Sequence, residues 1–135
     1  MARALGIDYG IKRTGISVTD PLKLIVNGLT TISTEELMAF IREYLKKEPV
    51  DLIVFGDPYH KDGKPTELNS IIHGIGKEFS DLHPHVKIDF QNESYTSQQA
   101  IEKLIQKGTP KNKRSKEAID QMSAVLILQK YLNHY

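Results

Sequence analysis

Three acidic residues are the most informative feature of this sequence. Asp8 ends the apolar run Ala4–Ile7, Asp120 follows the apolar Ile119, and Glu93 lies just past the alternating segment 86–91. Aspartate disfavours β-strands, and an unpaired buried charge carries a large free-energy penalty. Carboxylates that meet also repel one another unless something neutralises them. A bound cation is therefore the simplest compensation for this set.

Mg²⁺ or Mn²⁺ suits such a set, because hard cations prefer oxygen ligands and complete their shell with water and substrate phosphates. Two such ions about 4 Å apart can activate the attacking water and stabilise the leaving oxygen of a phosphodiester. The chain has no cysteine, which excludes disulfides, thiolate zinc sites and cysteine nucleophiles. We therefore predict metal-dependent phosphodiester hydrolysis, with Asp8, Glu93 and Asp120 as both the catalytic and the metal-binding residues.

Basic residues gather in two segments that could contact phosphates. One follows the first expected strand, and the other, at 103–116, holds six basic residues and no acid. A local basic face binds polyanions even when the net charge is only +1, as it is here. Either segment could instead be solvated surface. The predicted nucleic-acid contacts are Lys12, Arg13, Lys111, Lys113, Arg114 and Lys116.

Two further residues are weaker candidates for the same site. Asp57 precedes Pro58 and follows an apolar run, so it is either a turn residue or an additional acid at the site. His60 lies in the turn-rich segment 57–65 and could contact substrate.

Composition places the chain among soluble globular proteins. Its 135 residues suit a single domain over 1–135, and 26% of them are charged against 39% apolar. No apolar run approaches the roughly 20 residues that a membrane span requires. The absence of cysteine fits a reducing cytosol. We therefore expect a cytoplasmic protein with no membrane partner, as a monomer or a homodimer.

The first half of the chain reads as three strands, a helix and a buried strand. The strands are expected at Arg3–Asp8, Arg13–Thr19 and Leu24–Ile32, from alternating apolar and small polar residues. Ser33 and Glu36 resemble a capping box for a helix that ends at Glu48–Pro49. The continuous apolar run 51–56 indicates a strand covered on both faces.

The second half alternates helices with one more strand. Helical spacing is expected to bury Leu68, Ile71, Ile72, Ile75 and Phe79. The segment 86–91 alternates as a strand, a helix follows around 100–105, and a last helix runs from about Ser115 to Tyr131.

The order β-β-β-α-β-α-β-α-α predicts an α/β fold. Its mixed five-stranded sheet has helices on both faces, as in the ribonuclease H-like (RNase H-like) fold. The first strand would lie between the second and the fourth. Asp8 and Glu93 would then lie near the carboxyl ends of their strands, where open sheets bind ligands. The three acids converge if the last helix packs its first turn against strand one.

Four ordered motifs resemble the YqgF family. They are Gly-Ile-Asp-Tyr-Gly-x-Lys-Arg-Thr-Gly at 6–15, Thr-Asp-Pro-Leu at 19–22, Glu-Ser-Tyr-Thr-Ser at 93–97 and Lys-x-x-Ile-Asp-Gln-Met-Ser-Ala-Val-Leu-Ile-Leu-Gln at 116–129. Members are small bacterial RNase H-fold proteins, described as Holliday junction resolvases and as nucleases that mature the 5′ end of pre-16S ribosomal RNA. The resemblance covers essentially the whole chain. It implies Asp8, Glu93 and Asp120 as the acidic metal-binding set and favours an RNA substrate.

Two departures from the family pattern keep alternatives open. The chain has Asn92-Glu93-Ser94 where Asp-Glu-Arg is usual, and Gly56-Asp57-Pro58 where Gly-Leu-Pro is usual. The first change removes a forked phosphate contact and a charge. A module that binds nucleic acid without cutting it, or a Holliday junction resolvase, is therefore an alternative. The segment 6–10 also resembles the phosphate-binding hairpin of actin-like ATPases. Those proteins enclose the nucleotide between two lobes of this fold, and this chain has one lobe and no second phosphate motif.

Overall fold

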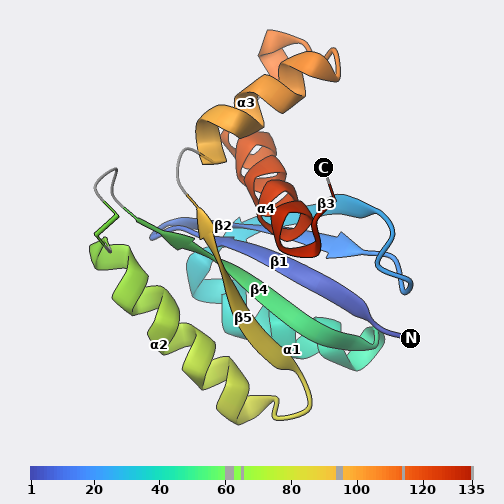
Figure 1. The fold of residues 1–135 in the computed structure, drawn as a ribbon, viewed down its shortest axis with the longest axis vertical. Helices are drawn as coiled ribbons and strands as arrows, with labels where there is room; N and C mark the ends of the chain where they lie inside the picture. The colour runs from blue at the N-terminus through green and yellow to red at the C-terminus, as the bar shows by residue number, and fades with distance from the viewer. Residues whose placement is uncertain (60–62, 65, 94–95, 114, 135) are drawn as a thin grey trace.

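The computed structural model describes residues 1–59, 63–64, 66–93, 96–113 and 115–134, with the backbone alone at 96–97 (Figure 1). The strands are β1 (Arg3–Tyr9), β2 (Arg13–Thr19), β3 (Val26–Ser33), β4 (Val50–Pro58) and β5 (Lys87–Glu93). The α-helices are α1 (Leu37–Lys47), α2 (Glu67–Leu82), α3 (Thr96–Gln106) and α4 (Lys116–Leu132), with short 3-10 helices η1 (Thr34–Glu36) and η2 (Lys111–Lys113).

The five strands form one mixed sheet in the order β3-β2-β1-β4-β5. β1 pairs antiparallel with β2 and parallel with β4, and β5 is parallel to β4. The predicted topology is confirmed, including the central place of the first strand. Asp8 pairs with Gly15 of β2, and Glu93 pairs with Pro58 of β4.

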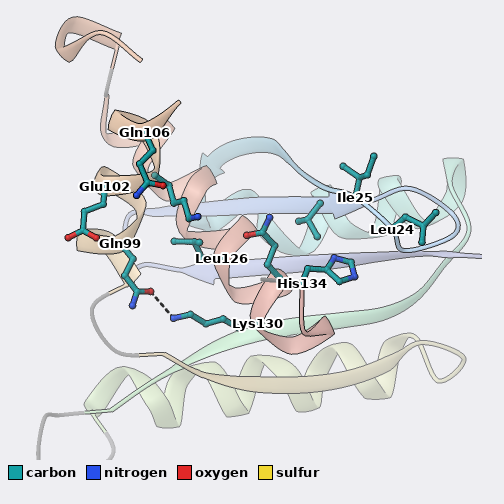
Figure 2. Close-up of a pocket in the computed structure, with 11 residues that line it drawn as sticks. Leu24, Ile25, Gln99, Glu102, Gln106, Leu126, Lys130 and His134 are labelled. Atoms are coloured by element: carbon teal, nitrogen blue, oxygen red, sulfur yellow. Dashed lines mark hydrogen bonds between the residues drawn. The ribbon is translucent and has the colours of Figure 1, made fainter. Parts of the chain in front are cut away.

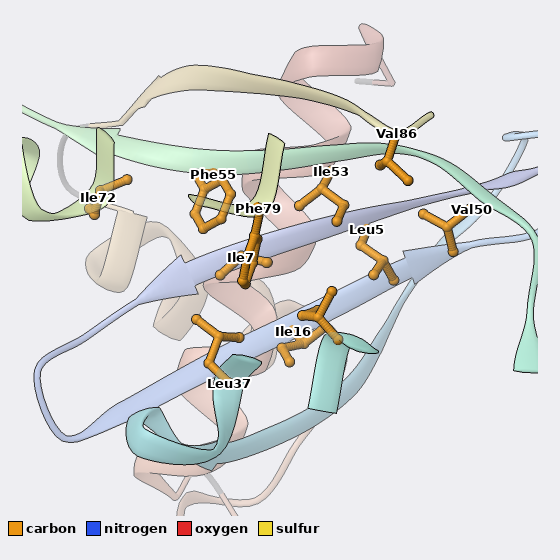
Figure 3. Close-up of a cluster of buried hydrophobic side chains, with 11 residues drawn as sticks. Leu5, Ile7, Ile16, Leu37, Val50, Ile53, Phe55, Ile72, Phe79 and Val86 are labelled. Atoms are coloured by element: carbon orange, nitrogen blue, oxygen red, sulfur yellow. The ribbon is translucent and has the colours of Figure 1, made fainter. Parts of the chain in front are cut away.

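Helices cover both faces of the sheet. On one face α1 and α2 bury an apolar cluster that includes Leu5 and Ile7 of β1 (Figure 3). On the other face α4 lies against the sheet, and α3 packs on α4 (Figure 1). Side chains alternate along a strand, so Asp8 points to the α4 face while Ile7 points to the opposite core. No helix in the described part of the chain is long and apolar enough to cross a membrane.

Helix α4 approaches the sheet unusually closely. A Cβ added to Gly6 would lie 2.8 Å from the carbonyl oxygen of Ala124, so only glycine fits beneath the helix there. Ser17 of β2 donates a 2.7 Å hydrogen bond to the same oxygen. The apolar side chains of α4, including Leu128, bury a second cluster against the sheet. The helix backbone is therefore fixed over the strands.

Two local predictions were wrong. Ser33 makes no capping hydrogen bond, because it is the last residue of β3 and pairs with Arg13. Helix α1 begins only at Leu37, after η1. Ile71 was expected in the core but is 47% exposed, because the buried side of α2 passes through Ile72 and Phe79.

Candidate functional site

Asp8 and Asp120 are brought together by the close contact between α4 and β2. Asp120 lies in the second turn of α4, with its backbone directly over Gly15. A Cβ on Gly15 would come within 2.1 Å of the Asp120 carbonyl oxygen. Gly15 is the residue paired with Asp8. Asp120 therefore projects from the helix above the strand next to Asp8.

Glu93 reaches Asp8 from the other side. A Cβ on Gly56 would lie 2.7 Å from the carboxyl carbon of Glu93, so this side chain lies over β4. Phe55 pairs with Ile7 of β1, so the next residue of β4, Gly56, lies beside Asp8. Asp8 is thus flanked in the sheet by two glycines, and each glycine is covered by a residue that carries an acid.

The electrostatics agree with this placement. Burial, most of all, and then the negative charges of Glu93 and Asp120 raise the pKa of Asp8 well above its ordinary value. A side-chain hydrogen bond with Glu93 acts in the same direction. The contributions of Glu93 and Asp120 to this shift mean that both carboxylates lie within electrostatic range of Asp8. The structure therefore brings the three predicted acids together, while their catalytic role stays a prediction.

Asp120 also has a basic partner. Nε of Arg13 donates a hydrogen bond of 2.8 Å to Oδ2 of Asp120, with 38% of the arginine side chain and 20% of the aspartate side chain exposed. This hydrogen bond raises the pKa of Arg13. Arg13 was predicted as a nucleic-acid contact, and its pairing with Asp120 was not expected.

The donor chemistry fits Mg²⁺ or Mn²⁺, because the three acids offer only oxygen and Asp8 lacks full compensation for its charge. In the present arrangement, however, no group of three or more His, Cys, Asp or Glu side chains in the described ranges could hold a metal ion. The residue types are suitable, but the present side-chain positions do not form a three-acid group among the described residues.

Sequence reasoning missed Ser123, which lies on α4 three residues after Asp120 and four before Ile127. Residues at these spacings share one side of a helix. Ile127 and the carboxyl group of Glu93 both lie against Gly56. Ser123 is only 1% exposed, and its hydroxyl has no hydrogen-bond partner within the described structure. The available signal was a small polar residue inside the apolar run 122–128.

Asp57 does not share the surroundings of the three acids. Its buried carboxylate accepts hydrogen bonds from Tyr59 (3.1 Å) and the Asn69 side chain, and lies 2.9 Å from Nε2 of His73. The His73 ring stacks on Phe90 at 4.0 Å. These contacts tie the start of α2 to the end of β4, so Asp57 is better explained as a structural residue than as a metal ligand. Sequence spacing gave no sign of His73.

The predicted basic contacts lie on two segments of the chain. Lys12 is exposed in the β1–β2 turn, directly before Arg13. Lys111 and Lys113 are exposed in η2, and Lys116 is exposed at the start of α4, one turn before Asp120. Predictions for Arg114, His60 and Ser94 fall outside the described residues. The described lysines therefore lie on segments that lead into the site.

A separate groove of about 550 Å³ lies between α3, the end of α4 and residues 24–26 (Figure 2). Leu24 and Leu126 contribute apolar surface, and Lys130 donates a 2.7 Å hydrogen bond to Gln99 at its edge (Figure 2). None of the three acids lines this groove. It is therefore distinct from the acidic site.

Comparison with known proteins gives consistent matches over the whole chain. Residues 2–134 match the family described as RuvX, Holliday junction resolvase. A relative from Flavobacterium johnsoniae, named "Putative pre-16S rRNA nuclease", is 42% identical over 134 residues, which are 98% of this chain and 97% of the relative. A relative from Porphyromonas gingivalis with the same name is 41% identical over 135 residues, covering 99% and 98%.

Solved structures support the fold. The structure titled "T. thermophilus RuvC in complex with Holliday junction substrate" matches with a TM-score of 0.57 at 14% identity, covering 98% of this chain and 96% of that one. RuvC has an RNase H-like fold, so the predicted fold class is confirmed.

Proposed function

This chain belongs to the RuvX family, and we propose that it is a divalent-metal-dependent nuclease that hydrolyses phosphodiester bonds in structured nucleic acid. Its most favoured substrate is the 5′ region of pre-16S ribosomal RNA, in the bacterial cytoplasm. Relatives about 40% identical over nearly their whole length carry the corresponding name, which supports this substrate.

One observation carries the proposal: the acids from β1, β5 and α4 crowd together around the buried Asp8, whose pKa is raised first by its burial and then by the charges of Glu93 and Asp120. A fold gains nothing in stability from such crowding, so a ligand that needs the charge is the natural explanation. Asp8, Glu93 and Asp120 would hold Mg²⁺ or Mn²⁺. The metal supplies an activated water and stabilisation of the leaving oxygen.

The protein's other contribution is to hold the nucleic acid. Arg13, Lys12 and Lys116 lie near or lead into the acidic site and can neutralise phosphates along one strand. Such contacts give salt-dependent affinity without reading the sequence. Recognition would then depend on the shape of a folded RNA together with the positions of these basic groups.

The direct test is cleavage of a labelled RNA that contains the 16S 5′ end with its leader. The protein should cut it with Mg²⁺ or Mn²⁺, and EDTA should stop the reaction. Asp8→Asn and Asp120→Asn should each abolish cleavage, while circular dichroism shows an unchanged fold. Full activity in EDTA, or in both variants, would exclude the proposal.

A Holliday junction resolvase is the second candidate, because the matched family carries that description. A four-way DNA junction and the RNA precursor, compared at equal concentration, separate the two functions. A module that binds without cutting is also open, because Asn92 replaces the acid usual in the family. Cleavage that appears only in the double variant Asn92→Asp, Ser94→Arg would favour that alternative.

A further inference from the structure

We infer that Arg13 and a divalent cation compete for Asp120, and that cation binding releases the guanidinium to hold a phosphate of the nucleic acid. This inference rests on the proposed function and adds a means of regulation to the same site. It assigns Arg13 two successive partners, a carboxylate in the free protein and a phosphate in the complex.

The present geometry favours competition between the two partners of Asp120. The guanidinium of Arg13 lies 2.8 Å from Oδ2 of Asp120. The side chains of Asp8 and Glu93 share a hydrogen bond. No three described acids together form a metal-holding group in this arrangement. Asp120 must therefore turn from Arg13 toward Asp8 to complete a set of three carboxylates. A guanidinium left at its side would repel the incoming dication.

The backbone allows this exchange without a change of fold. The Asp120 carbonyl is fixed over Gly15, so the helix itself stays in place. Only the two side chains need to rotate, and both are partly exposed. Glu117, one turn earlier on α4, is the other acid whose charge acts on Arg13 and would keep the released side chain near the site.

The released side chain suits a phosphate. A guanidinium has five N–H donors in a planar fork that matches phosphate oxygens. A dication bound by the acids would also attract the phosphate that Arg13 contacts. Metal and nucleic acid would then bind cooperatively, because each favours the same arrangement of Arg13.

The opposite hypothesis is that Arg13 holds Asp120 in its metal-binding position. A carboxylate has two oxygens, so Asp120 could accept from Arg13 with Oδ2 and bind the ion with Oδ1. The two hypotheses predict opposite signs. If Arg13 competes, removal of its charge should tighten metal binding; if it positions Asp120, the same removal should weaken it.

The test is calorimetric titration of Mn²⁺ into the full-length wild type, Arg13→Gln and the control Lys12→Gln, at one pH and ionic strength. Arg13→Gln should bind Mn²⁺ about threefold more tightly, the factor that corresponds to an ordinary part-exposed ion pair. Lys12→Gln removes the same charge from the neighbouring residue, which is exposed, and should change the affinity by less than about twofold because solvent screens it.

The second measurement is stopped-flow anisotropy with a fluorescein-labelled RNA hairpin, which records binding before cleavage. Mn²⁺ should strengthen RNA binding more in the wild type than in Arg13→Gln. Equal or weaker Mn²⁺ binding by Arg13→Gln would overturn the exchange and leave the proposed nuclease function intact. Failure of the wild type to bind Mn²⁺ would overturn both.

Discussion

The contact between Gly15 and α4 can be tested by the single substitution Gly15→Ala. The new methyl carbon would lie 2.1 Å from the Asp120 carbonyl oxygen and 2.4 Å from its carbonyl carbon. Real Cβ contacts below about 3.0 Å are essentially absent, so the helix must shift by at least the difference, 3.0 − 2.1, or about 0.9 Å. All the charged residues of the site remain. The substitution therefore changes geometry alone.

We expect two effects of Gly15→Ala. Overpacking should lower the free energy of unfolding by about 1–3 kcal/mol. Displacement of Asp120 by about 1 Å should lower kcat/KM for RNA cleavage by about 100-fold and weaken Mn²⁺ binding, because catalysis depends on the relative positions of the acids. Thermal unfolding, Mn²⁺ calorimetry and cleavage rates measure the three quantities.

Gly74→Ala is the matched control. Gly74 lies inside α2, and a Cβ there would meet no atom within 4 Å. Alanine is a better helix former than glycine, so this variant should be more stable by about 0.5–1 kcal/mol with unchanged activity. If Gly15→Ala is folded and retains wild-type Mn²⁺ affinity and cleavage, the close contact does not position Asp120 for function.

Three further predictions concern Asp8, Ser123 and Tyr131. Asp8→Asn should abolish Mn²⁺ binding yet raise the melting temperature without metal. Because the pKa of Asp8 is raised in the folded protein, its contribution to stability is present below the unfolded pKa of about 3.9 and is lost as the pH rises. The melting temperature of the wild type should therefore approach that of the variant as the pH falls from about 8 to about 4. An unchanged gap across this range would contradict the crowding. Ser123→Ala should leave the melting temperature unchanged or raise it, because the lost hydroxyl has no described partner. Ser17→Ala removes a buried hydrogen bond and should lower the free energy of unfolding by about 1 kcal/mol. Equal losses of stability in the two variants would show that the Ser123 hydroxyl is hydrogen-bonded. Tyr131→Phe should lose about 1 kcal/mol near neutral pH, because the Tyr131 hydroxyl donates a 2.5 Å hydrogen bond to Asp89. That bond lowers the pKa of Asp89, so the difference in urea-unfolding free energy should shrink as the pH falls below about 4 and vanish only below the lowered pKa of folded Asp89. Burial and the bond raise the pKa of Tyr131 to about 12, so the difference should also vanish as the pH rises from about 10 to about 12. A difference that persists at both extremes would contradict the assignment.

The sequence predicted the elements and the topology because these depend on local patterns. Alternation in 13–19 and the continuous apolar run 51–56 fix the faces of two strands, and the crossover helices then place the strands in parallel. Asp8 and Asp120 could be identified as candidates because a carboxylate beside apolar residues is costly, whereas Glu93 was identified from its place at the end of a strand and from the family motif. The boundary at Ser33 failed because pairing with Arg13 outweighed the local capping pattern.

The partners of the site residues were not predictable. Arg13 and Asp120 are 107 positions apart and meet only because α4 docks on Gly15. His73 meets the buried carboxylate of Asp57 only because of the rotation of α2 about its axis. Contacts of this kind depend on how closely elements pack, and single-sequence periodicity carries no information about that distance.

The site has one part set by the backbone and one set by a side-chain rotation. The Asp120 main chain is held over Gly15 and the Glu93 carboxyl over Gly56, so both depend on close packing against the sheet. The direction of the Asp120 carboxylate depends instead on Arg13. Perturbing the two parts should therefore have opposite effects on Mn²⁺ affinity: Gly15→Ala weakens it and Arg13→Gln strengthens it. Arg13→Gln acts by letting the Asp120 side chain rotate toward Asp8, and Gly15→Ala moves Asp120 away from the position where that rotation helps. The double variant should therefore bind Mn²⁺ no more tightly than Gly15→Ala alone. Full additivity of the two effects would mean that Arg13 acts only through its long-range charge.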